Sequence, residues 1–144
     1  MATDYNFERF ITAQEDTYFT ALSEIKNGRK QSHWMWFIFP QIKGLGFSET
    51  SKLYAISDRR EAIQYLEHPV LGKRLEEISN AILKVTGKSA HEIFGSPDDI
   101  KLQSSMTLFG SLPNAHPVFQ SVLNTCFNGI KDEKTLQLIK TSPV

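Results

Sequence analysis

The sequence is short of cysteine, of net charge and of long hydrophobic runs, and each shortage excludes a class of protein. Its single cysteine, Cys126, cannot form an internal disulfide, and residues 1–5 show neither the basic start nor the apolar h-region of a signal peptide, so we expect a reducing, cytoplasmic environment. Sixteen basic residues balance sixteen acidic ones, which disfavours binding to nucleic acids or anionic membranes. The longest apolar run, residues 34–39, is too short to cross about 30 Å of hydrocarbon. We therefore expect no membrane segment.

The composition is nevertheless that of a folded protein. Apolar residues make up 40% of the 144 residues and aromatic residues 11%, which excludes disorder over most of the chain. A chain of this length buries roughly two thirds of the surface that its unfolded form exposes. Because no low-complexity tract or long linker divides the sequence, we expect a single domain over residues 1–144.

Apolar residues recur at spacings of three and four along most of the chain, a pattern typical of amphipathic helices. The pattern is clearest over residues 71–85 and also predicts one long helix over residues 7–27. The shape of residues 32–41 stays open because their apolar residues show no period. No segment alternates with a period of two. The expected fold class is therefore all-α, a compact single-domain bundle of about seven helices of unequal length.

Polar residues mark where several of these helices begin. Ser48, Asp58 and Ser89 have the side chains and positions of N-caps. Ser96 is expected to cap a further helix that has Pro97 in its first turn and extends to residue 110.

Common catalytic and metal-binding patterns are absent from the sequence. The four histidines share no metal-ligand spacing, so neither a metal site nor a cofactor is predicted. Cys126 lies one helical turn from Val122 on an apolar stripe, which favours a core position over a nucleophile. There is also no Gly-x-Ser-x-Gly elbow, Walker loop or complete Gly-x-Gly-x-x-Gly motif.

Residues 29–41 combine cations and two tryptophans with a very apolar stretch. Trp34 or Trp36 could stack on a planar base while Arg29 and Lys30 meet a phosphate. In the alternative interpretation, the two indoles fill the hydrophobic core and the cations are solvated.

Residues 98–107 place three hydroxyl residues in the middle of a predicted helix. Ser104, Ser105 and Thr107 are below-average helix formers, so either a tight helix crossing or a polar site must compensate for them. Together with Gln41, the two serines could accept hydrogen bonds from buried indole N–H groups or from His33.

Two carboxylates open the same helix. Asp98 and Asp99 suit the positive end of the helix dipole, and Lys101 can pair with Asp98. Next to a cleft, the same carboxylates could act as a base or hold a ribose diol, and His33 would complete an acid–base set.

Three segments together resemble the domain-of-unknown-function family numbered 1810: residues 28–41, 62–75 and 93–109. Its members are small, mostly bacterial, predominantly helical single-domain proteins, so the resemblance implies a compact all-α domain and no agreed reaction. Some relatives carry the label calpastatin, a protease inhibitor that looks nothing like this chain. Residues 68–75, followed by Phe94-Gly95, also look distantly like domains that process NAD-derived and ADP-ribosylated compounds.

The sequence therefore suggests a pocket between residues 32–41 and 96–109 that binds or processes a nucleotide-like small molecule of the NAD or ADP-ribose type. Whether the protein is an enzyme stays open. In the alternative, the motifs are a structural core and the chain is a non-enzymatic protein-interaction module with an unknown partner. The catalytic candidates are His33, Asp98 and Asp99. The ligand-binding candidates are Arg29, Lys30, Trp34, Trp36, Gln41, Lys101, Ser104 and Ser105.

Overall fold

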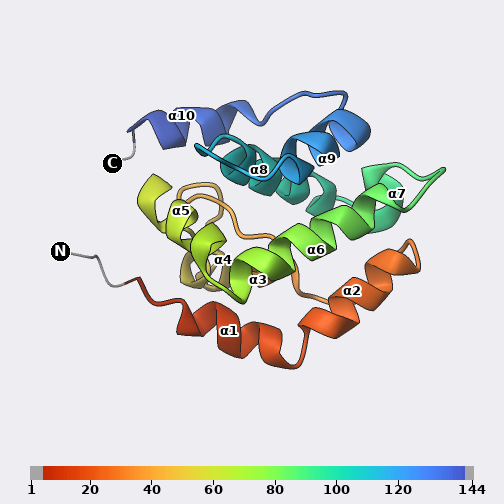
Figure 1. The fold of residues 1–144 in the computed structure, drawn as a ribbon, viewed down its shortest axis with the longest axis horizontal. Helices are drawn as coiled ribbons and strands as arrows, with labels where there is room; N and C mark the ends of the chain where they lie inside the picture. Colours follow the sequence, from red (N-terminus) through yellow and green to blue (C-terminus); the bar gives the residue numbers. More distant parts are fainter. Residues whose placement is uncertain (1–4, 142–144) are drawn as a thin grey trace.

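The computed structural model describes residues 5–141, which form ten α-helices (Figure 1). In order they are α1 Glu8–Glu15, α2 Tyr18–Lys26, α3 Met35–Ile38, α4 Glu49–Leu53, α5 Arg59–Glu67, α6 Leu71–Leu83, α7 Ala90–Phe94, α8 Asp98–Gly110, α9 Val118–Phe127 and α10 Glu133–Thr141. No strand occurs in this part of the chain, although Ile42 and Ile56 form an isolated parallel bridge. The all-α class is confirmed, but the expected number of about seven helices is wrong.

The first third of the chain accounts for two of the additional helices. The long helix expected over residues 7–27 is two helices, α1 and α2, which break at Asp16–Thr17. Short polar side chains of this kind compete for backbone hydrogen bonds and weaken a helix. Residues 35–38, whose shape the sequence left open, form the short helix α3, and Pro40 follows soon after its end.

Three of the expected helix caps are confirmed, and one is wrong. The side chains of Ser48, Asp58 and Ser89 each accept a backbone N–H three residues later. Ser96 does not cap α8. The backbone N–H groups of Ile100 and Lys101 both donate to the Pro97 carbonyl, and the helix begins one residue later than expected, with Pro97 as its N-cap.

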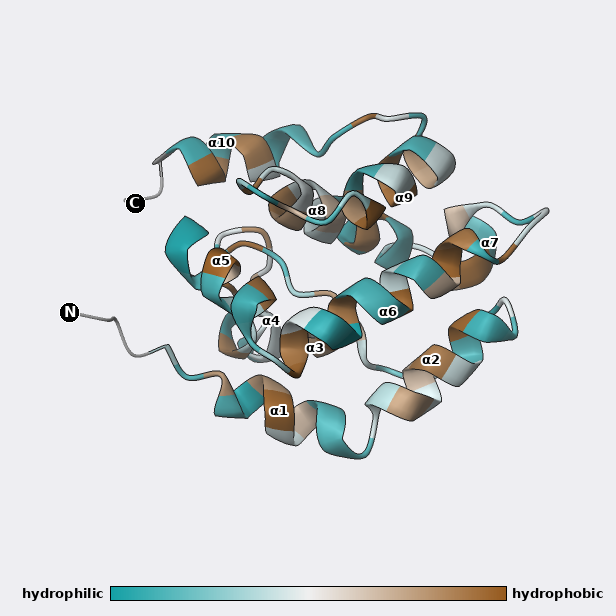
Figure 2. Ribbon diagram, viewed as in Figure 1, coloured by the Kyte–Doolittle hydropathy of each residue, from teal (hydrophilic) through white to brown (hydrophobic). Residues whose placement is uncertain are grey.

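The helix α8 lies deep in the molecule, in contact with α3, α5, α7, α9 and α10. Its side chains from residue 104 to residue 109 are all buried. The other helices have one apolar and one polar side, as is typical of helices that pack a single face on a core (Figure 2). Because α3 packs against α8, the segment that contains the two tryptophans lies next to the helix that contains Ser104, Ser105 and Thr107.

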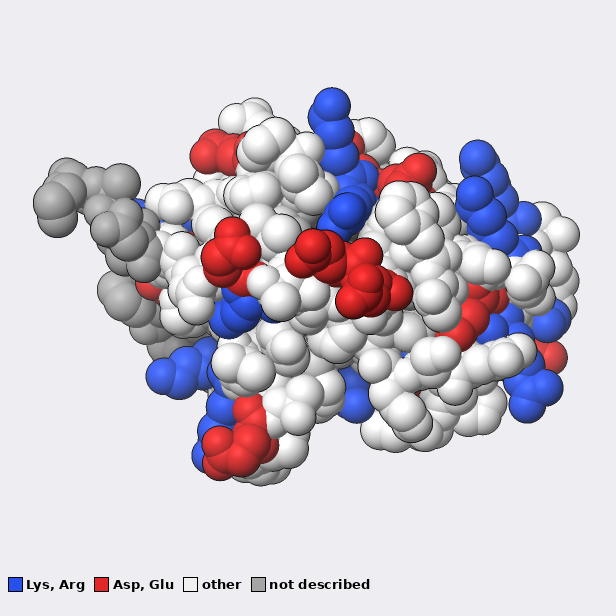
Figure 3. Space-filling view, turned by 90° about the horizontal axis from the view of Figure 1, so that it is seen from below, with Lys and Arg blue, Asp and Glu red and all other residues white. Residues whose placement is uncertain are grey.

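The surface carries both signs of charge. On the face seen from below the view of Figure 1, acidic and basic groups are interspersed, and no large patch of one charge forms (Figure 3). None of the helices within residues 5–141 is long and apolar enough to cross a membrane.

Candidate functional site

The carboxylate of Glu24, near the end of α2, organises the loop that leads to the tryptophans. It accepts the backbone N–H groups of Gln31 and Ser32 at 2.8 and 3.0 Å, the hydroxyl of Ser32 at 2.5 Å and the indole N–H of Trp34 at 2.9 Å. Trp34 is only 1% exposed, so its polar group is satisfied inside the protein. Trp34 therefore takes the position of a core residue.

Trp36, two residues later, faces outward. In α3, the side chains of Met35 and Ile38 enter the core, which turns the half-buried indole of Trp36 toward the surface. The ammonium of Lys101 lies 4.4 Å from the centre of this ring, within the range of a cation–π interaction. Three pockets adjoin at Trp36, which forms part of the wall of each.

The first pocket, of about 150 Å³, lies between the 30–37 segment and the start of α8. On its wall, Asp98 forms ion pairs with Lys30 at 2.9 Å and Lys101 at 3.1 Å. Burial on its own would raise the pKa of Asp98, but the hydrogen bonds and charges of the two lysines hold that pKa below its ordinary value. His33 also lines this pocket and is exposed.

The second pocket, of about 200 Å³, lies between Trp36, the first half of α8 and the start of α10. Ser104 lines it and donates from its hydroxyl to the carboxylate of Asp132 at 3.2 Å. Asp132 also accepts the backbone N–H of Thr135 at 3.0 Å, which satisfies the first turn of α10. The hydroxyl of Thr107 accepts the backbone N–H of Asp132 at 2.9 Å. The hydroxyl residues of α8 therefore hold the start of α10 in place.

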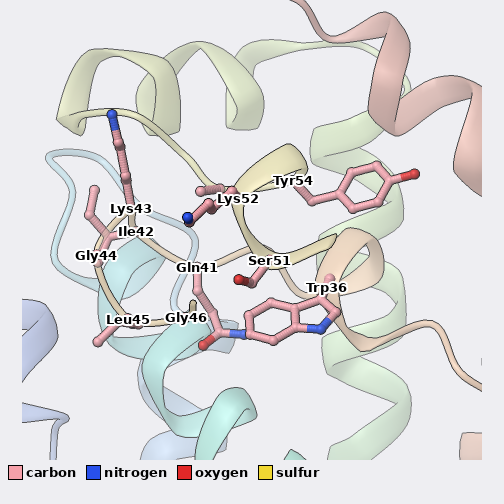
Figure 4. A pocket seen from close by; sticks show the side chains of 11 residues that line it. Trp36, Gln41, Ile42, Lys43, Gly44, Leu45, Gly46, Ser51, Lys52 and Tyr54 are labelled. Atoms are coloured by element: carbon pink, nitrogen blue, oxygen red, sulfur yellow. The ribbon is translucent and has the colours of Figure 1, made fainter. Parts of the chain in front are cut away.

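The third pocket is a small cavity of about 40 Å³ on the other side of Trp36, closed by the loop of residues 42–46 (Figure 4). A Cβ atom at Gly46 would lie 2.5 Å from Ser51 Cβ and 3.0 Å from the Trp36 ring, so only glycine allows this close approach. The side chain of Gln41 lies beside the Trp36 ring and lines both this cavity and the second pocket.

Lysines outnumber acidic residues among the residues that line the three pockets, although the whole chain is neutral. The charged residues that line the three pockets are five lysines and two aspartates: Lys30, Lys43, Lys52, Lys101, Lys134, Asp98 and Asp132. A concave site with such an excess attracts anions.

The structure brings together most of the site residues named from the sequence, but not all of them. The first pocket is lined by Lys30, His33, Trp34, Trp36, Asp98 and Lys101, and the second by Trp36, Gln41, Lys101 and Ser104. Arg29 is exposed and lines none of the three pockets. Asp99 lies 3.3 Å from His91 and Ser105 is fully buried, and both also lie outside them.

Sequence reasoning missed several residues that shape the site. Glu24 gave no signal, because a carboxylate ten residues before a tryptophan follows no local pattern. Asp132 and Lys134 reach the second pocket because α10 folds back onto α8. Only the tertiary fold places these two residues.

Two further observations concern histidine, cysteine and acidic side chains. Within residues 5–141, no three histidine, cysteine or acidic side chains gather as metal ligands would. Cys126 is half-buried, and burial raises the pKa of its thiol, which disfavours the reactive thiolate.

Comparison with known proteins identifies relatives without a described activity. The family described as "Protein of unknown function (DUF1810)" matches residues 4–139. The crystal structure of the conserved hypothetical protein Rv1873 from Mycobacterium tuberculosis is similar to this chain, with 43% sequence identity and a TM-score of 0.93. The match covers 96% of this chain and 99% of that one. A comparison with curated proteins gives no match.

Proposed function

The chain belongs to the DUF1810 family, and we propose that it binds a nucleotide-like small molecule, a ring joined to phosphate as in NAD or ADP-ribose, in the pockets around Trp36. The observation that carries this proposal is the half-buried Trp36 indole in a setting rich in lysine. An aromatic platform beside cations is the combination that binds a planar base and a phosphate together.

Trp36 is the stacking residue in this proposal. Stacking of a base on an aromatic side chain contributes about 1–3 kcal/mol, which is enough to orient a small ligand. Trp34 supports the platform from the core, where its indole N–H is already bound to Glu24.

Lys101 and Lys134 are the phosphate-binding residues in this proposal. Both line the second pocket, whereas Arg29 lies outside the three pockets. Lys30 and Lys101 both pair with Asp98, but the side chain of Lys30 is only 7% exposed, against 22% for Lys101, so Lys30 contributes to the local field more than to direct contact.

The size of the site favours one nucleotide unit. The first and second pockets, of about 150 and 200 Å³, share Trp36 and Lys101 as walls. Together they reach the lower end of the range of about 300–1,000 Å³ that is usual for small-molecule pockets. A larger molecule such as NAD would place one of its two nucleotide halves here.

His33 is the acid–base group in this proposal. Its exposed side chain lines the first pocket. Asp98 is engaged by two lysines, and a carboxylate with a lowered pKa is a weak base. Asp99 is turned toward His91 instead.

Thermal shift and calorimetry with AMP, ADP-ribose, NAD and inorganic phosphate test the proposal. At least one of the nucleotides should raise the melting temperature of the wild-type protein, since a ligand that binds only the folded state stabilises it. The variant Trp36→Ala should lose that shift. Phe19→Ala is the matched control, because Phe19 is 68% exposed and lies outside these pockets.

The indole fluorescence gives a second measurement. Stacking on Trp36 should quench part of the emission of the wild-type protein, and Trp36→Phe should remove that quenching while the buried Trp34 still emits. The proposal is wrong if none of the nucleotides binds, or if Trp36→Ala binds them as tightly as the wild type.

A further inference from the structure

We infer that Gln41 determines ligand specificity: its buried carboxamide donates a hydrogen bond to an acceptor atom on the edge of the ligand's ring. The ligand class is then a heterocycle with a ring nitrogen or carbonyl oxygen at that edge, rather than a sugar phosphate alone. This inference rests on the proposed function, and it adds which part of the ligand is recognised.

The observation behind it is an unpaired polar group inside the site. Gln41 is 5% exposed, and its Nε2 atom has no hydrogen-bond partner among the described residues. Buried amide groups in proteins are almost always hydrogen-bonded, because leaving one unpaired costs free energy. The side chain forms part of the wall of the second pocket and of the small cavity, beside the Trp36 ring (Figure 4). A ligand that stacks on Trp36 would therefore bring its ring edge close to this amide.

The backbone holds Gln41 in this position. Its carbonyl accepts the backbone N–H of Ile56 at 2.9 Å, and the neighbouring Lys43 N–H donates to the Ile56 carbonyl at 2.8 Å. These bonds form the bridge between Ile42 and Ile56, which fixes the chain on both sides of Ile42. Because the backbone is fixed here, the carboxamide can reach only the positions that its own side-chain rotations allow, which limits the ligand groups it can meet.

Gln14, another buried glutamine of this protein, is a useful comparison because its carboxamide has a structural role. Gln14 is 1% exposed, and its Nε2 atom donates to the carbonyl of Phe37 at 2.9 Å and to the hydroxyl of Tyr65 at 3.1 Å. Its Oε1 atom accepts from Arg74 at 3.4 Å. The carboxamide of Gln14 is thus fully used inside the protein, and that of Gln41 is not.

Three glutamine-to-methionine variants separate the roles, since methionine has nearly the same length and no amide. Gln41→Met removes the unpaired group, Gln14→Met removes the structural one, and Gln31→Met changes an exposed glutamine outside the three pockets. Calorimetry with AMP, UMP and ribose 5-phosphate measures binding, and thermal unfolding without ligand measures stability.

We expect Gln41→Met to melt at the wild-type temperature or above it, because the variant buries no unpaired amide. Its affinity for AMP and UMP should fall by about tenfold, the scale expected for the loss of one neutral hydrogen bond. Its affinity for ribose 5-phosphate, which lacks the ring, should stay the same. Gln31→Met should match the wild type, and Gln14→Met should melt at a lower temperature.

Three results would overturn the inference while leaving the proposed function in place. The first is unchanged affinity of Gln41→Met for both nucleotides. The second is an equal loss of affinity for ribose 5-phosphate, which would assign Gln41 to the phosphate end. The third is a melting temperature as low as that of Gln14→Met, as expected if Gln41 is a structural residue that holds an internal water. If the wild type binds neither AMP nor UMP, the proposed function fails and this inference fails with it.

Discussion

The carboxylate of Glu24 accepts the indole N–H of Trp34 at 2.9 Å and so holds in place a buried residue that lines the first pocket. The same carboxylate accepts the backbone N–H groups of Gln31 and Ser32, so one side chain on α2 holds residues 31–34. This loop leads directly into α3, which carries Trp36. Glu24 therefore positions the segment that leads to Trp36 without lining the three pockets.

Glu24→Gln should lower the free energy of unfolding near neutral pH by about 2 kcal/mol, the scale of a hydrogen bond to a charged group. Burial alone would raise the pKa of Glu24, but its hydrogen bonds lower that pKa from 4.5 to about 2. Because the folded-state pKa lies below the unfolded one, the stabilisation is complete above pH 4.5 and is lost as the pH falls toward about 2. Urea unfolding across this range measures the effect.

The exposed residue Glu15 supplies the control for that experiment. Glu15→Gln should change stability little, because the side chain of Glu15 is exposed to solvent. The difference between wild type and Glu24→Gln should shrink as the medium becomes more acid through this window. A difference that stayed constant with pH would show that the glutamine disturbs packing rather than charge.

Gly72→Ala should destabilise the protein strongly. A Cβ atom at Gly72 would lie 2.0 Å from the carbonyl oxygen of Leu66, far inside van der Waals contact, because α5 and α6 meet closely after the turn at residues 68–69. Backbone atoms have little room to yield, so we expect a loss of about 3 kcal/mol or more in thermal unfolding.

Gly110→Ala is the matched control for the Gly72 variant. Its Cβ would meet Phe119 at 3.4 Å, an ordinary contact, and Gly110 is the last residue of α8. Alanine in a helix is favoured over glycine by about 0.5–1 kcal/mol, so this variant should be as stable as the wild type or more so. Equal losses in the two variants would contradict the steric argument.

Local sequence signals were sufficient to predict where most helices lie, but not where the long helix expected over residues 7–27 breaks. Ser48, Asp58 and Ser89 were predictable as caps because a cap depends on residues within one turn. The break at residues 16–17 was not, because apolar residues continue at helical spacing on both sides of Asp16 and Thr17, and two weak helix formers do not by themselves end a helix.

The candidate site shows the same limit. In the sequence, Trp34 and Trp36 are equivalent candidates for stacking. The structure separates them through Glu24, which holds the first indole inside, and through Lys101, which lies over the second. Likewise the motif around Gly72, which looked distantly like part of an NAD-processing domain, has a packing explanation in the contact with Leu66. These contacts join residues far apart in the sequence, so spacing alone could not reveal them.

Lys134→Glu should weaken binding of AMP. The substitution changes the charge on the second pocket by two units, so we expect a loss of about tenfold at low salt and a smaller loss at high salt, where charges are screened. Lys140→Glu makes the same change on the same helix, outside the three pockets, and should have little effect. Calorimetry at two salt concentrations compares them. Equal losses in both variants would mean that AMP responds to overall charge and not to this pocket.

Asp98→Asn should move stability and binding in opposite directions. It leaves Lys30 and Lys101 without their carboxylate, and Lys30 is only 7% exposed, so unfolding should become easier by about 1–2 kcal/mol. The same change removes a negative charge from the first pocket, so AMP should bind several times more tightly. Asp99→Asn is the control, because Asp99 faces His91 outside the three pockets and should alter neither property much. If Asp98→Asn instead abolished binding, Asp98 would have to contact the ligand itself, as a carboxylate that accepts hydrogen bonds from a ribose diol would.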